Sequence, residues 1–322
     1  MSRLQNLFRT DDFDPESRNR VLLISGIVVI VIFSLALIAF GYYTDRVEPR
    51  SATVFTVGDR NFSYTYLEDR VNAAVAEGTF NTSNVSFGIA QTVSDIQNEE
   101  LTRRIAAQDG LTITDEELDA GMRADVGVTP DADRNLFAAA LRDRLQTLDL
   151  SLGRYKERLS AGLLEDRMIS QISTGLPAEL EQVELNILVV DTDAAAAAAK
   201  QRITDGEDFG EVAKEVSLHS SATNGGAIGW TPKELLSDDL AEPVFALEAD
   251  SVSDVIETEN GFYVVKINGK EMRAVDDGMK SNLARTEFGK RLEAASEEYE
   301  LQNLVTVEQA QRIANQIQVP GG

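Results

Sequence analysis

The segment from Leu185 to Lys270 constrains the fold of this chain most strongly, because it contains dissimilar blocks in a defined order. A short apolar run at 187–190 is typical of a buried strand, and the alanine-rich stretch 194–204 favours a helix. A loop rich in Ser and Gly follows at 217–229. The dipeptide Asn260-Gly261 is a strong hairpin signal that precedes a last apolar strand. We therefore predict a small α/β domain with an antiparallel sheet and helices around it.

These blocks, in this order and spacing, resemble the parvulin family of peptidyl-prolyl isomerases. The resemblance rests on four blocks of the sequence, at 185–190, 206–209, 224–230 and 260–267. It implies rotation of X-Pro bonds without a cofactor, in an apolar pocket that holds the proline ring beside polar groups. Uncatalysed rotation crosses a barrier of about 20 kcal/mol and is slow enough to limit folding.

The resemblance also assigns candidate catalytic residues. The family carries two facing histidines on the pocket floor, and the matching positions here hold Asn186 and Tyr263. The family's Cys or Asp position matches His219, and its threonine before the last strand matches Thr258. Asn186 and Tyr263 could share a hydrogen bond, because an amide and a phenol both donate and accept. The loss of both histidines leaves two hypotheses open, an isomerase with weak or lost catalysis and a non-catalytic peptide binder.

The apolar pocket positions are the second part of the inferred site. By the same resemblance, Leu236 and Leu240 are substrate-binding residues, with Phe245 as the family's following aromatic. The only tryptophan, Trp230, is interpreted either as a core anchor or as part of a peptide groove. Nucleotide binding is disfavoured because the glycines at 225–229 lack the phosphate-loop pattern and its lysine.

A stretch of 23 residues without a charge, 21–43, predicts a transmembrane helix. As a helix it extends about 35 Å, enough to cross a bilayer hydrocarbon core. Arginines before it outnumber those just after it, so we expect a cytoplasmic tail at 1–20 and the bulk of the chain outside the cell membrane. A cleaved signal peptide is the competing interpretation, but its Ser34-Leu35-Ala36 triplet lies inside the apolar run.

The remaining sequence predicts a mostly helical domain around the α/β segment. A strand at 53–57 precedes helices at about 64–77, 89–110, 134–147 and 151–172, and Thr114 to Glu117 form a capping box. Gly175-Leu176-Pro177 predicts a domain boundary. Helices at about 275–300 and 306–317 follow the segment. The order is similar to that of extracytoplasmic foldase-chaperones of the SurA, PrsA and PpiD type, which implies an α+β fold with a chaperone domain at 44–176, a parvulin-like domain at 177–272 and C-terminal helices at 273–322 that complete the helical domain.

Charge and composition limit the partners. The formal charge of −24, from 54 acidic and 30 basic residues, argues against a nucleic-acid partner. Cysteine is absent and histidine occurs once, which excludes disulfides and the usual zinc sites, so we predict no metal and no cofactor. The expected partners are unfolded or proline-containing polypeptides and the lipid bilayer through 21–43, with a translocon or another membrane complex as a further candidate.

Overall fold

The computed structural model describes residues 31–32, 34–36, 48–80 and 84–318. The predicted cytoplasmic tail and nearly all of the predicted transmembrane segment 21–43 lie outside these residues. Among the described helices, none has both the length and the apolar character that a bilayer crossing requires. The described residues divide into two compact units, one formed from those within 48–97, 131–155 and 299–318, the other from 98–130 and 156–298.

The first unit contains a three-stranded antiparallel sheet with the order β2-β1-β8. The strand predicted at 53–57 is confirmed as β1, and Ser63 caps the next helix by accepting a hydrogen bond from the Tyr66 amide at 3.2 Å. The short strand β8 was not predicted from the sequence. The elements that belong wholly to this unit are α2 (Glu48–Ser51), β1 (Thr53–Val57), β2 (Arg60–Ser63), α3 (Tyr64–Ala76), α6 (Arg134–Leu148), β8 (Leu301–Asn303) and α12 (Val307–Gln318).

Two long helices, α4 (Val85–Gln108) and α7 (Leu152–Gly175), contribute residues to both units. Their bounds agree with the helical periodicity of the sequence, and α7 ends at the predicted boundary before Pro177. The second unit adds α5 (Asp115–Asp125), whose Thr114 capping box is present as predicted. Thr114 Oγ1 accepts from the Glu117 amide at 3.2 Å, and the Glu117 carboxylate accepts from the Thr114 amide at 2.8 Å.

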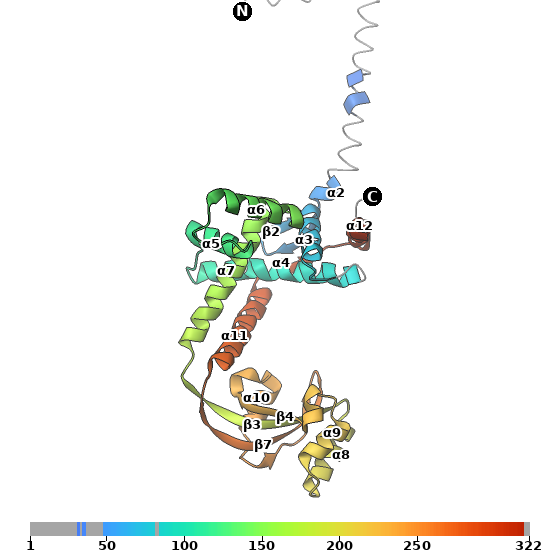
Figure 1. The fold of residues 1–322 in the computed structure, drawn as a ribbon. Helices are drawn as coiled ribbons and strands as arrows, with labels where there is room; N and C mark the ends of the chain where they lie inside the picture. The colour runs from blue at the N-terminus through green and yellow to red at the C-terminus, as the bar shows by residue number, and fades with distance from the viewer. Residues whose placement is uncertain (1–30, 33, 37–47, 81–83, 319–322) are drawn as a thin grey trace, which may run out of the picture. The chain divides into compact units, whose positions relative to one another are not determined.

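The larger sheet belongs to the second unit and is fully antiparallel. Its strand order is β4-β3-β7-β5, with β6 also paired to β7, and the long strands β3 and β7 run side by side (Figure 1). The elements are β3 (Glu179–Val190), α8 (Asp193–Thr204), α9 (Phe209–Val216), η5 (Ser220–Asn224), β4 (Ala227–Pro232), η6 (Lys233–Leu235), α10 (Asp238–Phe245), β5 (Ser251–Val252), β6 (Ile256–Thr258), β7 (Gly261–Ala274) and α11 (Asp277–Glu298). The mixed helical and antiparallel-sheet fold expected from the sequence is therefore present.

The two faces of this sheet carry separate apolar cores. We call one the α10 face, where alternate residues of β3 pack against α10; its buried members are Val183, Leu185, Ile187, Val189, Leu240, Val244, Val265 and Ile267. The other is the α8–α9 face, built from Leu188, Val190, Ala196, Ala199, Phe209, Val212, Ala213 and Val264. The small alanines of α8 allow that helix to approach the sheet closely. Each large apolar side chain buried in this way contributes about 1.5–3 kcal/mol.

Candidate functional site

The α10 face carries a half-buried apolar surface in addition to its core. Leu236, Phe245, Leu247, Ile256 and Tyr263 pack against the core cluster but remain partly accessible. All three predicted substrate-binding residues, Leu236, Leu240 and Phe245, therefore lie together with Tyr263. The structure forms one apolar surface from positions that are separated by up to 27 residues in the sequence. Such a surface suits an apolar ring of a polypeptide segment.

Local hydrogen bonds and charges hold residues 236–245 of the α10 face in place. Leu236 follows the 3₁₀ turn η6, where its amide donates to the Lys233 carbonyl at 3.1 Å. Asp238 and Asp239 occupy the first turn of α10, where carboxylates are stabilised by the helix dipole. At the other end, Lys270 on β7 donates from Nζ to the Phe245 carbonyl at 2.6 Å and lies 5.6 Å from the centre of the Phe245 ring. The sequence interpretation did not identify Lys270 as part of this region.

Tyr263 is the polar-tipped residue of this surface. Its strand register places it opposite Val189 on β3 and opposite Ile256 on β6. Both neighbours belong to the α10 face, so the phenol ring packs there and is half-buried. A phenol hydroxyl both donates and accepts, so it can bond an amide in either orientation.

Asn186 lies on the opposite side of the sheet from Tyr263. Neighbouring residues of a strand point to opposite faces, and Leu185 and Ile187 both point to the α10 face. The Asn186 amide donates to the Gly225 carbonyl at 3.1 Å and accepts from Asn268 Nδ2 at 2.9 Å. The structure therefore does not form the hydrogen bond between Asn186 and Tyr263 that the sequence suggested, because strand alternation separates them.

Thr258 ends β6 at the hairpin to β7. Its hydroxyl donates to the Gly261 carbonyl at 3.1 Å and accepts from the Asn260 amide at 3.1 Å. Both hydrogen bonds stay inside the turn that the Asn260-Gly261 signal predicted. Thr258 is therefore occupied in shaping the hairpin that presents Tyr263.

His219 is the N-cap of the 3₁₀ helix η5. Its Nδ1 accepts from the Ser221 amide at 3.1 Å and lies 2.8 Å from the Ser221 hydroxyl. The preceding Leu218 donates from its amide to the Val189 carbonyl at 2.8 Å, so the loop is attached to β3 beside the residue that pairs with Tyr263. His219 and Tyr263 thus belong to segments on either side of Val189. The ring nitrogen Nε2 of His219 is not used by this cap.

The glycines of the 225–229 loop allow the loop to pass close to β3. Gly226 has a φ of 76°, and a Cβ on it would lie 2.3 Å from the Ile187 carbonyl oxygen. Its own carbonyl accepts from the Ile187 amide at 2.8 Å. A side chain at Gly226 therefore has no room, and this contact fixes the loop that carries His219.

Trp230 is not the core anchor that one interpretation of the sequence expected, and its role in a peptide groove stays a prediction. It is half-buried on β4 and belongs to neither core cluster. Its ring lies against Gly269 on β7 and is covered by the Arg273 guanidinium, 4.2 Å from the ring centre. Trp230 therefore packs over the bulged part of β7, a position that depends on a strand register invisible in the sequence.

Metal-ligating groups are not assembled in the described residues, where no cluster of three or more His, Cys, Asp or Glu side chains has a suitable arrangement. The residues of the α10 face themselves offer apolar contacts and one phenol. The catalytic and binding roles inferred for these residues stay predictions.

Comparison with known proteins finds similarity for part of the second unit. Residues 190–269 match the rotamase family model, described as a PPIC-type PPIase domain. Foldase protein PrsA of Geobacillus kaustophilus is 28% identical over 125 residues, which cover 38% of this chain and 44% of that protein. Chaperone SurA of Aromatoleum aromaticum is 36% identical over 103 residues, 32% of this chain and 23% of the relative. A crystal structure of the peptidylprolyl isomerase PrsA from Bacillus anthracis aligns at 18% identity with a TM-score of 0.41, covering 56% of this chain and 94% of that chain. The chain spans less than half the length of these curated relatives.

Proposed function

Because residues 190–269 of this chain are a PPIC-type parvulin domain, we propose that the protein is a membrane-anchored extracytoplasmic foldase-chaperone. Its substrates are proline-containing segments of unfolded polypeptides, which bind on the α10 face. Residues 21–43 anchor it in the cell membrane with the N-terminus in the cytoplasm. The similarity to proteins named foldase and chaperone supports this proposal, as does the uncharged stretch of the sequence.

One observation carries the binding function: Leu236, Phe245 and Tyr263, all half-buried, pack against the core cluster that contains Leu240. A proline ring is apolar and rigid, so it gains from burial against such a surface without a large loss of conformational entropy. In the proposed mechanism, the ring is held there while the preceding carbonyl group rotates. The Tyr263 hydroxyl can donate a hydrogen bond to the prolyl nitrogen of the twisted amide, which accepts better than in either planar form because its lone pair is no longer delocalised.

Catalysis by this domain is weak or lost in our proposal. Of the four candidate catalytic side chains, Asn186, Thr258 and His219 already make hydrogen bonds that hold the strand, the hairpin and the η5 cap. Tyr263 is the member of the four that packs on the α10 face, so its hydroxyl is placed to interact with an amide bound there. A second candidate function follows from the same observation: a non-catalytic parvulin-fold module that binds polypeptides, either as a chaperone or as an accessory subunit of a membrane complex.

A protease-coupled assay on a prolyl tetrapeptide distinguishes the two functions. A catalysed rate that falls at least tenfold in Tyr263→Phe supports the isomerase, since Phe keeps the ring and removes only the hydroxyl. Rates at the uncatalysed level for the wild-type chain, together with saturable binding of the same peptide, support the non-catalytic binder. Absence of both rate enhancement and peptide binding rejects the proposed function.

The proposed anchor and domain arrangement have separate tests. Extraction of the protein from membranes by alkali without detergent would refute the anchor at 21–43. We also propose that the C-terminal region 273–322 completes the helical domain that begins at 44–176. In support, β8 near the C-terminus pairs with β1 near the N-terminus, and the Leu304 amide donates to the Val54 carbonyl at 2.8 Å. Removal of 299–322 should therefore destabilise the first unit, which near-UV circular dichroism can follow.

A further inference from the structure

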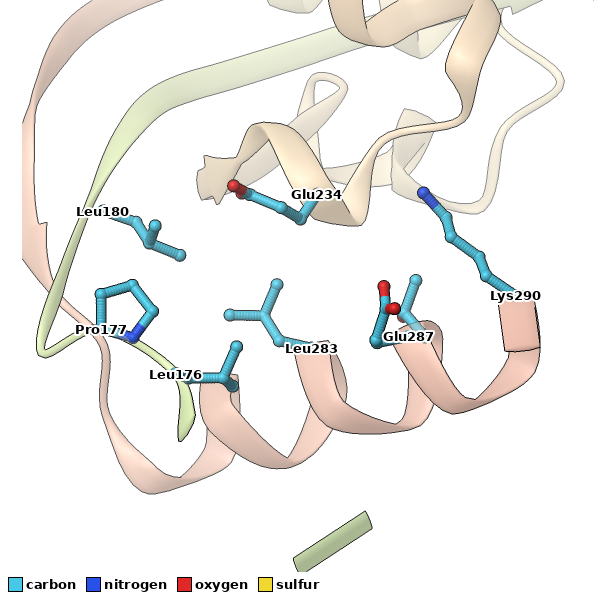
Figure 2. A pocket seen from close by; sticks show the side chains of 8 residues that line it. Leu176, Pro177, Leu180, Glu234, Leu283, Glu287 and Lys290 are labelled. Carbon is cyan, nitrogen blue, oxygen red and sulfur yellow. The ribbon is translucent and has the colours of Figure 1, made fainter. Parts of the chain in front are cut away.

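A cavity of about 270 Å³ lies outside the α10 face, where the connector after α7 meets η6 and α11. Its lining is mainly apolar at the base and charged at the rim, and consists of Leu176, Pro177, Leu180, Glu234, Leu283, Thr286, Glu287 and Lys290. Figure 2 shows Leu283 of α11 pointing toward Leu180 and Glu234 across the cavity. The volume is just below the range of about 300–1,000 Å³ that accommodates drug-sized ligands, so it suits one or two amino-acid side chains.

The rim of the cavity has an excess of negative charge. Glu234 on η6 and Glu287 on α11 are both exposed and come from different elements. Lys290 also lines the cavity, and its Nζ lies 3.7 Å from an Asp238 carboxylate oxygen; Lys233, next to Glu234, has its Nζ 2.5 Å from a Glu242 carboxylate oxygen. A ligand with an apolar group beside a positive charge therefore complements both the base and the rim.

The cavity adjoins the α10 face through neighbouring residues of the chain. Glu234 lines the cavity, while Leu236, two residues later, packs on the α10 face. The 3₁₀ turn η6 thus contributes Glu234 to the cavity and leads directly into Leu236 of the α10 face. A polypeptide that occupies one of the two places has its neighbouring residues held near the second, which raises their effective concentration there.

We propose that this cavity is a second polypeptide-binding site, which takes a large aliphatic or aromatic side chain adjacent to an arginine or lysine. The proposal rests on the proposed function, because it assigns a second contact to the same unfolded polypeptides. Apolar burial supplies affinity at the base formed by Leu180 and Leu283, and Glu234 and Glu287 select the basic neighbour. The site explains why apolar side chains line an open cavity there rather than a closed core.

The test measures binding of short, proline-free fluorescent peptides to the full chain by anisotropy. The probe carries a central Phe-Arg pair, and matched peptides carry Phe-Glu or Ser-Arg. The double variant Glu234→Gln/Glu287→Gln should weaken binding of the Phe-Arg peptide about fivefold. The control Glu293→Gln/Glu297→Gln changes the net charge equally on the exposed part of α11, outside the cavity lining, and should leave binding unchanged.

A second variant, Thr286→Phe, fills the cavity and should abolish binding of the Phe-Arg peptide at an unchanged melting temperature. The proposal is overturned if the Phe-Arg peptide still binds the Thr286→Phe variant or does not bind the wild-type chain. It is also overturned if the control pair loses as much affinity as the Glu234/Glu287 pair, or if the Phe-Arg and Phe-Glu peptides bind equally well. Binding of a prolyl tetrapeptide, which is too short to span both places, should be the same in all variants. Failure of that binding alone rejects the proposed function and leaves the second site standing.

Discussion

Replacement of Asn186 by Ala should destabilise the second unit while leaving prolyl-peptide binding intact. The substitution removes the hydrogen bond to the Gly225 carbonyl, which is part-buried at 3.1 Å, and the exposed one from Asn268 at 2.9 Å. A part-buried bond whose partner is left unsatisfied costs about 1.5 kcal/mol, and the exposed bond adds about 0.5 kcal/mol. The expected loss is therefore about 2 kcal/mol, which lowers the melting temperature of a domain of this size by about 4–8 °C.

Two measurements test this expectation. Circular dichroism follows the thermal denaturation of the wild type and the Asn186→Ala variant, and fluorescence anisotropy measures binding of a prolyl peptide at a temperature where both are folded. Asn268→Ala is the matched control, because it removes only the exposed bond and should cost about 0.5 kcal/mol. A double-mutant cycle between the two positions should give a coupling of similar size. A variant Asn186→Ala that keeps its melting temperature but loses peptide affinity would show that Asn186 faces the ligand, and would refute the assignment of faces.

Three further results are expected. Gly226→Ala should lower the free energy of unfolding by about 3 kcal/mol or more in chemical denaturation, because its Cβ would lie 2.3 Å from a backbone oxygen. Gly229 is also at positive φ but has open space around it, so Gly229→Ala should lower the free energy of unfolding by only about 1–2 kcal/mol. Equal losses in the two variants would contradict the steric argument. His219→Ala should lower the stability of the folded state by about 1 kcal/mol in thermal melts, because it removes the cap of η5. His219→Asn should keep the cap and therefore most of the wild-type stability. Burial first, and then Asp166, raises the pKa of Glu165 above its usual 4.5, so the native state favours the protonated acid and loses stability as pH rises through the shifted pKa. Glu165→Gln should accordingly be more stable than the wild type at pH 7 by up to about 0.5 kcal/mol, a gap that closes below pH 4.5 in urea titrations; a gap that widens on acidification would have the wrong sign.

Local sequence signals were sufficient for most of the helices and the turns. The Thr114 box, the Ser63 cap and the stop at Gly175 act within one helical turn, so the sequence alone contains what determines them. The strand β8 could not be found in this way. Its three residues show no usable alternation, and it exists because β1, almost 250 residues earlier, offers an edge with which it pairs.

The apolar part of the candidate site was expected from the family resemblance, which named Leu236, Leu240 and Phe245. Leu236 precedes α10 and its N-cap, whereas Leu240 and Phe245 lie within that helix, so no local spacing groups the three. The relation of Asn186 to Tyr263 was not predictable, because it depends on the register between β3 and β7. That register includes a bulge between Glu184 and Leu185, where β7 inserts Asn268 as an extra residue. No feature of either strand taken alone specifies this insertion.

The bulges of β3 account for the structural role of Asn186. The register with β7 shifts at Glu184/Leu185 and the register with β4 shifts at Leu185/Asn186, so both edges of β3 are irregular at the same point. Irregular pairing leaves backbone groups that need other partners, and the Asn186 side chain satisfies Gly225 on one side and contacts Asn268 on the other. An amide serves this bridging role because it donates and accepts at once. The polar contribution to any catalysis then falls to Tyr263, whose ring faces the apolar surface, so substitution there, and not at Asn186, should decide whether this domain isomerises prolines.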